Sequence, residues 1–464
     1  MSVCLSQTLP LSVDPVELFW LFKSEPNVFF LDSSLVNPLL GRYSFIGFDP
    51  FETFQGRGEK TLSRLKERFN LYQENIKAPF TPFPSGLVGF LSYDLGHKLE
   101  NIRQKRKDDQ ALPDGFFGFY DTVITIDHLA EKIYITSTGF PEQRKDLRSK
   151  RAHEQINRIR RKINSCLSTR QPFKFLSQGP SSNNGSLNFM SNFTKKEYCR
   201  AIEKALEYIR QGDIYQVNLA QRFCLDIKHK NVDPGFLYLA LRGLSPSCFG
   251  AYFDAGPFQI ISSSPERFLQ VTGQVVQTRP MKGTRSRGET KTQDADNRKE
   301  LIKSPKEKAE LLMVTDLERN DLGRVCKFGS IKVKKMRAIE SYRTVFQATS
   351  TVEGVLQKKK DVFDVLKACF PGGSITGCPK IRAMGIIEEL ESVPRGIYTG
   401  AFGYISFPGD MDLSVLIRTL LIQKDNIYFH VGGGIVADSD PEAEYQETLV
   451  KAKAIKECLQ RYLG

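Results

Sequence analysis

The chain has 464 residues, of which 40% are hydrophobic, so it can bury a large core, and its length suggests roughly three domain-sized units. Lys and Arg outnumber Asp and Glu by 66 to 53, an excess that favours anionic partners. The basic runs at 158–162 and 332–337 contain few aromatic residues, so a small acidic substrate or a solvated basic face fits at least as well as nucleic acid.

The nine cysteines also limit the class of protein. They are odd in number and lack a CxxC pair or zinc spacing, which is typical of the reducing cytosol. The first 30 residues lack the apolar run of a signal peptide because they contain Asp14, Glu17, Lys23 and Glu25. No stretch of about 20 apolar residues occurs elsewhere. We therefore expect a cytoplasmic protein that is neither secreted nor inserted in a membrane.

The first third of the chain alternates short apolar runs with turn residues, a pattern typical of antiparallel strands. We expect strands at 41–47, 86–93, 118–127 and 132–138. A basic helix is predicted over 141–163. It is followed by a stretch rich in Ser, Gln, Pro, Gly and Asn, which we interpret as a linker. The resulting division is an N-terminal region 1–165, a linker 166–187 and a C-terminal region 188–464.

The C-terminal region alternates helical and strand patterns. Residues 194–212 have helical spacing, with Asn192 or Thr194 as the N-cap. Strands and helices then alternate to the end of the chain without an internal repeat. A mixed α+β or α/β enzyme is therefore the expected fold class.

Two predicted helices carry candidate metal ligands. Glu310 lies in the helical run 306–313, and Glu444, Glu447 and Lys451 share one face of a helix that starts after residue 440. Solvated ion pairs on surface helices are the plain alternative. If Glu310 faced Glu447 across a pocket, the two carboxylates would form an open oxygen site for Mg²⁺. The five histidines show no ligand spacing that would favour zinc.

Glycine-rich loops and one lysine are the other candidates. Residues 370–377 and 431–435 could bring backbone N–H groups to an anion or could simply form tight turns, and neither fits a nucleotide-binding motif. Lys282 lies between Met281 and Gly283 in the run 279–284. It is either a surface lysine or an amine made nucleophilic by a lowered pKa.

An ordered set of motifs runs through nearly the whole chain. They lie at residues 212–219, 264–268, 280–284, 316–325, 370–380, 417–419, 432–439 and 442–448, and more loosely at 41–44, 89–94 and 120–121. Together they resemble the chorismate-binding enzyme family, which includes anthranilate, aminodeoxychorismate, isochorismate and salicylate synthases. The resemblance implies an α/β (α+β) fold of the anthranilate synthase component I type. In that fold two packed, antiparallel-rich sheets are surrounded by helices in one interwoven unit, an expectation that replaces the three units suggested by length.

The resemblance also implies roles for the candidate residues. It places Mg²⁺ at Glu310 and Glu447, with Glu444 nearby. Glu266 matches the family's general acid/base, and we expect an unusual pKa there if it protonates a departing hydroxyl. Asn218 is expected to contact the substrate. The positions that hold the substrate carboxylates correspond here to Arg418, Lys451, Thr376 and the N–H groups around Gly433.

Two positions indicate the reaction. Members that add water to chorismate have a Lys base where this chain has Gln216, which disfavours isochorismate or salicylate formation. Anthranilate synthases have Ala at the position of Lys282, and a Lys there is typical of aminodeoxychorismate synthase component I. We expect conversion of chorismate and ammonia to 4-amino-4-deoxychorismate, on the way to para-aminobenzoate and folate. The alternative is anthranilate synthase component I.

The mechanism implied by the resemblance is covalent. Lys282 attacks ring carbon 2 while the hydroxyl leaves carbon 4, and ammonia then enters at carbon 4 and expels the lysine. The chain shows no Cys-His-Glu glutaminase, because Cys378 belongs to the glycine-rich loop. A separate glutamine amidotransferase subunit is therefore implied as a heterodimeric partner. Neither nucleic acid nor a membrane is expected as a partner.

Two further positions remain to be tested. The family often has a His where Gln347 lies, and a Gln cannot exchange a proton near neutral pH, which puts more of the proton transfer on Glu266. The segment 30–34, with Ser33, resembles the region where relatives bind tryptophan, although a strand end with a polar turn is the plainer interpretation. From other classes, a non-catalytic binding protein or a basic RNA-binding module would leave Glu310 and Glu447 without a purpose.

Overall fold

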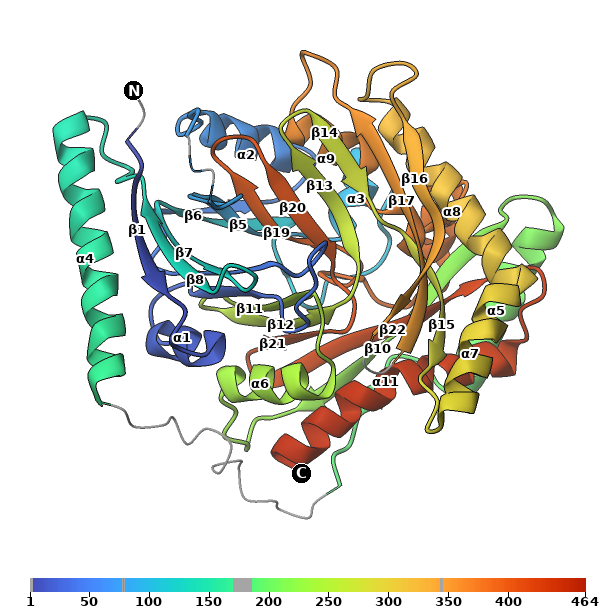
Figure 1. The fold of residues 1–464 in the computed structure, drawn as a ribbon. Helices are drawn as coiled ribbons and strands as arrows, with labels where there is room; N and C mark the ends of the chain where they lie inside the picture. The colour runs from blue at the N-terminus through green and yellow to red at the C-terminus, as the bar shows by residue number, and fades with distance from the viewer. Residues whose placement is uncertain (1–2, 77, 79, 170–185, 343–344) are drawn as a thin grey trace.

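Two antiparallel sheets organise the chain, and both are built from its two halves (Figure 1). The computed structural model describes residues 3–76, 78, 80–169, 186–342 and 345–464. Strand β2 of the N-terminal region pairs with β11, and β5 pairs with β19. The predicted fold of two antiparallel sheets in one interwoven unit is thereby confirmed.

The larger sheet has twelve strands. Its order is β1 (Leu5–Pro10), β8 (Lys132–Ser137), β7 (Thr122–Asp127), β3 (Tyr43–Gly47), β2 (Phe29–Asp32), β11 (Phe249–Asp254), β12 (Phe258–Ser264), β21 (Thr419–Gln423), β22 (Asn426–Ile435), β10 (Gln216–Asp226) and β18 (Gly377–Cys378), with β9 (Met190–Ser191) also on β10.

The smaller sheet has ten strands. Its order is β15 (Met281–Ser286), β17 (Val345–Val355), β14 (Val275–Thr278), β13 (Arg267–Thr272), β20 (Met411–Val415), β19 (Ala401–Ser406), β5 (Gly86–Leu91), β6 (Gly115–Tyr120) and β4 (Glu52–Gly56), with β16 (Lys332–Ser341) also on β17.

Helices cover the outer faces of both sheets (Figure 1). They are α1 (Pro15–Phe22), α2 (Thr61–Asn70), α3 (Asp94–Leu99), α4 (Lys145–Thr169), α5 (Lys195–Arg210), α6 (Pro234–Leu244), α7 (Lys291–Lys303), α8 (Pro305–Gly323), α9 (Val362–Cys369), α10 (Lys380–Leu390), α11 (Pro441–Leu463) and the 3₁₀ turn η1 (Gly373–Ile375). Among the described residues, none of these helices is both long and apolar enough to cross a membrane.

Three groups of buried apolar side chains hold these layers together. One lies between the sheets and includes Phe45 and Phe90, from β3 and β5 respectively. A second lies between the larger sheet and the helices α1, α4, α6 and α11. The third joins the smaller sheet to α2, α5, α9 and α10. Burial of apolar area is the main stabilising term in such a fold.

Local signals explain several elements. Thr194 caps α5 through a capping box with Glu197, as predicted for one of the two candidate caps. Asp440 caps α11, and Pro441 occupies its first turn. The strands expected at 41–47, 86–93 and 132–138 correspond to β3, β5 and β8. In these segments the local sequence signals favour the same structure as the burial of the side chains.

The single strand expected at 118–127 is wrong. The segment forms β6 and β7, which belong to different sheets and are separated at Asp121. The buried Asp121 carboxylate lies 3.4 Å from Arg151, and its backbone carbonyl accepts a hydrogen bond from Thr138 N. The uniform apolar pattern hides this crossing because both strands are buried on both faces.

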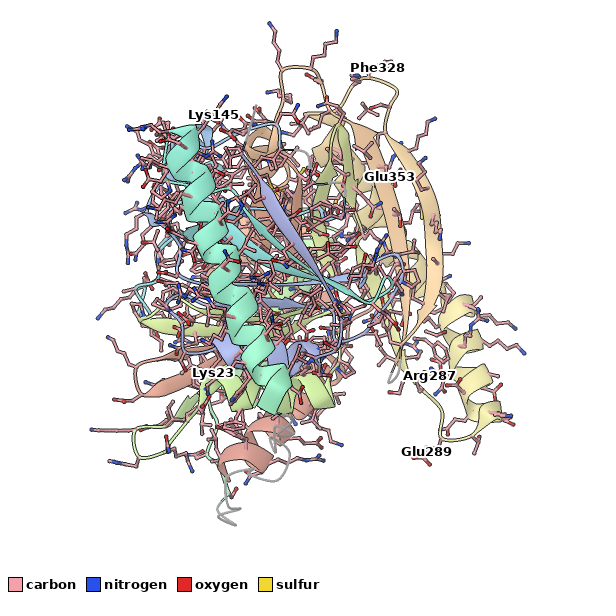
Figure 2. The ribbon with its side chains drawn as sticks, turned by 60° about the vertical axis from the view of Figure 1, so that its left-hand side comes forward. Lys23, Lys145, Arg287, Glu289, Phe328 and Glu353 are labelled. Atoms are coloured by element: carbon pink, nitrogen blue, oxygen red, sulfur yellow. The ribbon has the colours of Figure 1, made fainter. Side chains whose placement is uncertain are left out.

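The basic helix predicted over 141–163 is α4, which begins at Lys145 and continues to Thr169. Figure 2 shows it along the outside of the molecule, far from the β15–α7 connection that contains Arg287 and Glu289. The first four residues of the predicted linker, 166–169, are therefore helical. Residues 170–185 of that linker lie outside the described residues.

Candidate active site

The candidate residues gather around the end of β22, which lies beside β10 and packs against α11 (Figure 1). The strand ends in Gly432, Gly433 and Gly434. A Cβ on Gly433 would lie 3.2 Å from Glu444 Oε2 and 3.8 Å from Glu447 Oε1. A Cβ on Gly434 would collide with the Gln216 amide. The backbone therefore lies close to these three side chains, and a larger residue at either glycine would displace them.

Lys282 lies on the other side of this glycine strand from α11. Its Nζ is 3.3 Å from where a Cβ on Gly434 would be, and it makes no hydrogen bond or ion pair within the described part of the chain. A β-bulge at Gly283, with φ +81°, aims this part of β15. Burial lowers the pKa of Lys282, the Glu310 charge opposes that change, and the nearby Lys451 charge adds to it. The amine is thus available and more nucleophilic than an ordinary surface lysine.

Glu266 is the buried carboxyl of the site. It lies between β12 and β13, is 5% exposed, and accepts a hydrogen bond of 2.6 Å from Ser374 Oγ. Burial raises its pKa to about 7, although the Ser374 hydrogen bond and the Lys282 charge act in the opposite direction. A carboxyl with this pKa can donate a proton near neutral pH, as a general acid must.

The acidic residues of α11 border the opposite side. Glu444 is buried and accepts a hydrogen bond of 2.6 Å from Ser439 Oγ, while Glu447 is exposed and pairs with Lys451 at 2.7 Å. Burial acts to raise the pKa of Glu447, but the charge and hydrogen bond of Lys451, together with the charges of Lys306 and Lys282, lower the pKa overall. Lys451 also donates a hydrogen bond of 2.9 Å to the Gly432 carbonyl.

Glu310 is half-buried on α8 and has no hydrogen-bond or ion-pair partner among the described residues. Burial raises its pKa, the Lys282 and Lys306 charges oppose that change, and Glu444 adds to it. Glu310 is therefore near both the Lys282 amine and the Glu444 carboxylate of α11. The sequence alone could only suggest that these groups lie close together.

The acidic side chains of the site do not form a closed metal cage. Within the described ranges, no three His, Cys, Asp or Glu side chains converge closely enough to hold an ion by themselves. Mg²⁺ ordinarily keeps several waters and uses one or two carboxylates together with substrate oxygens. Glu444 and Glu447, both adjacent to Gly433, and the unpaired Glu310 suit binding of that kind.

The expected substrate-binding residues differ in whether their polar side chains already have hydrogen-bond partners. Arg418 is half-buried, its pKa is lowered by burial, and its guanidinium has no polar partner among the described residues. Such a cation suits an anionic ligand. The Asn218 side chain contacts Tyr398. The Thr376 hydroxyl already donates to the Gly372 carbonyl at 2.9 Å, so its side chain braces the loop.

Two buried amides lie near the amine. The Oε1 atoms of Gln216 and Gln347 have no hydrogen-bond partner in the described part of the chain, although the side chains are only 2% and 3% exposed. Gln347 lies on β17 opposite Thr284 and next to the partner of Lys282 in the strand register. Buried acceptors without donors are costly, so both are suited to a ligand that donates hydrogen bonds.

Ser33 lies in a separate small cavity of about 70 Å³ between the sheets, lined also by Tyr43, Phe249 and Tyr404. Its hydroxyl donates to the Tyr43 carbonyl at 2.7 Å, as a polar strand end would. The tryptophan site at Ser33 stays a prediction.

Sequence reasoning missed residues that act through the glycine-rich loop. Ser374 was part of a motif but was not predicted to bind Glu266. Glu318 accepts a hydrogen bond of 2.9 Å from Gly373 N, and burial raises its pKa to about 7. The position of each within a motif was the available signal, but a partner more than 50 residues away cannot be read from spacing.

Comparisons with known proteins agree with this architecture. The chain matches the family model for chorismate binding enzyme over residues 28–457. It is 38% identical to anthranilate synthase component 1 of Acetivibrio thermocellus, covering 96% of this chain and 92% of that protein. It is 36% identical to aminodeoxychorismate synthase component 1 of Bacillus subtilis (strain 168), covering 90% of each.

A solved structure gives the same result. The crystal structure of anthranilate synthase component I from Streptococcus pneumoniae TIGR4 superposes with a TM-score of 0.76 at 31% identity, covering 91% of this chain and 94% of that one. Sequence and fold agree over nearly the whole length, and the expected family is confirmed. This chain belongs to the family of chorismate-binding enzymes.

Proposed function

We propose that this chain is the chorismate-aminating component of an aminodeoxychorismate synthase. The observation that carries the proposal is Lys282, an amine with a lowered pKa and no polar partner among the described residues, beside the glycine strand of the site. Glu266, with a pKa of about 7, supplies the matching acid. An amine and an acid held in one site are the two groups that a covalent displacement of a hydroxyl requires.

The reaction proceeds in two balanced steps. The neutral Lys282 amine forms a C–N bond at ring carbon 2, both ring double bonds shift, and the C4–O bond breaks as Glu266 gives its proton to the leaving hydroxyl. Ammonia then forms a bond at carbon 4, both double bonds shift back, and the C2–N bond breaks to release Lys282. The excess proton from the incoming ammonia returns to Glu266. Two allylic displacements replace one poor direct displacement.

Binding of the substrate uses the positive charges and the backbone donor of the site. Arg418 and Lys451 would hold carboxylates of chorismate, and the N–H of Gly433 would add a backbone donor. Glu310, Glu444 and Glu447 would hold Mg²⁺, which when bound neutralises the ring carboxylate and polarises the ring. Gln347, in this arrangement, donates or accepts hydrogen bonds only and leaves proton transfer to Glu266.

Ammonia is expected from a second protein. The relatives named above are each called component 1 of a synthase, and we propose that a glutamine amidotransferase subunit is the partner of this chain. The cytoplasmic location stays a prediction that rests on the number and scattered spacing of the cysteines in the sequence.

Anthranilate synthase component I is the second candidate. It is favoured by the relatives from Acetivibrio thermocellus and Streptococcus pneumoniae, which have that name. The two activities differ in whether the pyruvyl side chain is kept. Product identity therefore separates them.

The deciding experiment incubates the protein with chorismate, Mg²⁺ and an ammonium salt at alkaline pH and separates aminodeoxychorismate from anthranilate. Lys282→Ala is expected to lose aminodeoxychorismate formation or divert it to anthranilate. Lys282→Arg, which keeps the charge but not the nucleophile, is expected to fail equally, and Lys335→Ala on exposed β16 is the control that keeps wild-type activity. Without ammonia, mass spectrometry should find a Lys282 adduct of chorismate less one water. Anthranilate from the wild type would sink the proposal.

A further inference from the structure

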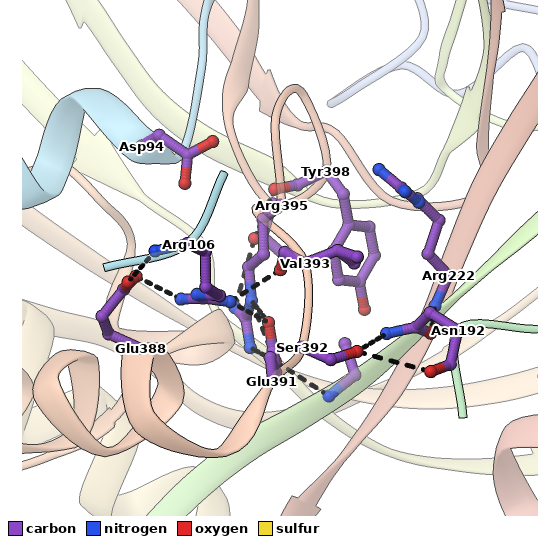
Figure 3. A network of polar contacts seen from close by, with 12 residues as sticks. Asp94, Arg106, Asn192, Arg222, Glu388, Glu391, Ser392, Val393, Arg395 and Tyr398 are labelled. Atoms are coloured by element: carbon purple, nitrogen blue, oxygen red, sulfur yellow. Dashed lines mark hydrogen bonds and ion pairs between the residues drawn. The ribbon is translucent and has the colours of Figure 1, made fainter. Parts of the chain in front are cut away.

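A fully buried arginine lies behind the candidate site. Arg395 follows α10 and pairs with Glu391, the residue that ends that helix; their side chains are 0% and 3% exposed. Two N–H groups of Arg395 donate to the Glu391 carboxylate, at 3.0 and 2.6 Å. Figure 3 shows the pair between Tyr398 on one side and Arg106 with Glu388 on the other.

The remaining donors of Arg395 hold two walls of the site. One NH1 donates to the Ile375 carbonyl of the glycine-rich loop at 2.9 Å and to Thr399 Oγ1 at 3.3 Å. NH2 donates to the Asn218 carbonyl of β10 at 2.7 Å. All five N–H groups of the guanidinium are therefore used, which is the maximum that an arginine offers.

Glu391 reinforces the same connection. Its Oε1 accepts a hydrogen bond of 3.0 Å from Ala220 N, two residues beyond Asn218 on β10. Asn218 N in turn donates to the Thr376 carbonyl at 2.7 Å. The Arg395 guanidinium also lies 4.6 Å from the Tyr93 ring centre and 5.7 Å from that of Tyr398, whose hydroxyl contacts the Asn218 side chain.

We infer that Arg395 is a positioning residue that sets the separation between β10 and the loop 373–376, and thereby the placement of Asn218 and of Ser374 against Glu266. It touches neither the amine nor the acid and acts through two backbone carbonyls. A lysine cannot replace it, because three donors on one nitrogen cannot reach both carbonyls and the carboxylate in this fixed geometry. A displacement of about 1 Å at such a wall can cost roughly a hundredfold in rate.

The chain offers a matched control. Arg148 is also buried, donates to the Glu74 carboxylate at 2.7 and 3.1 Å, and reaches the carbonyls of Thr138 and Val3. It lies on α4, which is far from β15 and α8, the elements that carry Lys282 and Glu310 (Figure 1). Arg148→Lys therefore imposes a similar loss of hydrogen bonds on the fold without touching β10 or the loop.

The test compares Arg395→Lys with Arg148→Lys at a temperature well below the melting transition of each. Chorismate consumption is followed whatever the product, and kcat and KM are separated. We expect both variants to melt lower than wild type, but only Arg395→Lys to lose roughly a hundredfold in kcat/KM, with a higher KM and a lower kcat. Wild-type kcat and KM for Arg395→Lys, or equal losses in both variants, would overturn the inference.

A second pair of variants tests the inference if Arg395→Lys does not fold. If Arg395→Lys does not fold, Glu391→Asp shortens the carboxylate by one methylene and keeps the charge, with Glu74→Asp as its control. A selective loss of kcat/KM in Glu391→Asp supports the inference, and its absence contradicts it. The inference rests on the proposed function only for the use of chorismate. Formation of anthranilate would end that proposal and leave this test intact, and the rise in Tm caused by chorismate gives a binding readout without turnover.

Discussion

Two ion pairs in this molecule share the same four-residue spacing but differ in burial and in the groups that they contact. Glu391 and Arg395 are buried and use the fork of the guanidinium to fix backbone carbonyls. Glu447 and Lys451 are 53% and 45% exposed on α11 and lie beside Gly433. A buried pair cannot lose one partner cheaply, whereas an exposed pair can rearrange in water.

The difference suggests a division of labour in the site. The wall made by β10, the glycine-rich loop and Glu266 is buried and held by hydrogen bonds of Arg395, Glu391 and Ser374, which suits groups that must hold one geometry. The wall made by α8 and α11 is wetter and carries charges that can change partners, which suits entry of a substrate and a hydrated cation. Chemistry on the rigid wall and ligand exchange on the open wall can then be altered separately.

The largest expected effect is on the rigid wall. Glu266→Gln removes the proposed acid and should lower kcat by roughly 10²–10⁴-fold. The wild-type carboxyl loses its proton as the pH rises through about 7, so the rate should show a corresponding limb that the variant lacks. A variant with wild-type kcat and an unchanged pH profile would assign the proton transfer to another group.

Stability should respond to the same substitution. Because the folded-state pKa of Glu266 is raised, the native protein binds a proton more tightly than the unfolded chain, and its stability falls as the pH rises from 4.5 to about 7. Glu266→Gln should flatten this dependence by up to about 3 kcal/mol, as seen by denaturant unfolding at several pH values.

A smaller effect is expected when the buried pair is broken. Glu391→Gln leaves the Arg395 charge without its carboxylate and should lower the free energy of unfolding by about 3 kcal/mol or more. Urea or guanidinium unfolding monitored by circular dichroism measures the change. A loss below about 1 kcal/mol would mean that the Glu391–Arg395 pair does not hold β10 and the glycine-rich loop rigidly.

The smallest change in stability is expected on the open wall. Glu447→Gln should alter the free energy of unfolding by less than about 1 kcal/mol, because the pair with Lys451 is exposed. It should nevertheless weaken the apparent affinity for Mg²⁺ in turnover by about tenfold or more. Titration of activity with Mg²⁺ after chelation tests this, with Glu442→Gln, exposed on the same helix, as the control. An unchanged Mg²⁺ dependence would remove Glu447 from the proposed ligands.

Much of the fold could be predicted because local signals and burial agreed. The Thr194 cap, the Asp440–Pro441 helix start and the alternating strands were all readable from sequence. The crossing at Asp121 was not, since two strands buried on both faces give one continuous apolar run. The order of strands was also hidden, because pairing partners lie hundreds of residues apart and only the family resemblance implied them.

The candidate site shows the same limit. Glu266, Lys282 and the acidic residues were found through motifs. The run of glycines in β22 indicated a place where backbone N–H groups could approach an anion. The state of each group was not readable: that Thr376 is occupied by its own loop, or that Glu391 and Arg395 are buried, follows from packing between distant segments. The same spacing of four residues gave no hint that one pair is dry and the other solvated.

The interleaved strand order has a consequence for synthesis of the chain. Strand β2 pairs on one edge with β3, which follows at once, but its other edge is reserved for β11, which emerges from the ribosome some two hundred residues later. At roughly 5–20 residues per second that edge stays open for roughly ten to forty seconds. An open strand edge is a template for wrong pairing. We therefore expect the N-terminal half, expressed alone, to expose this edge of β2 and to aggregate.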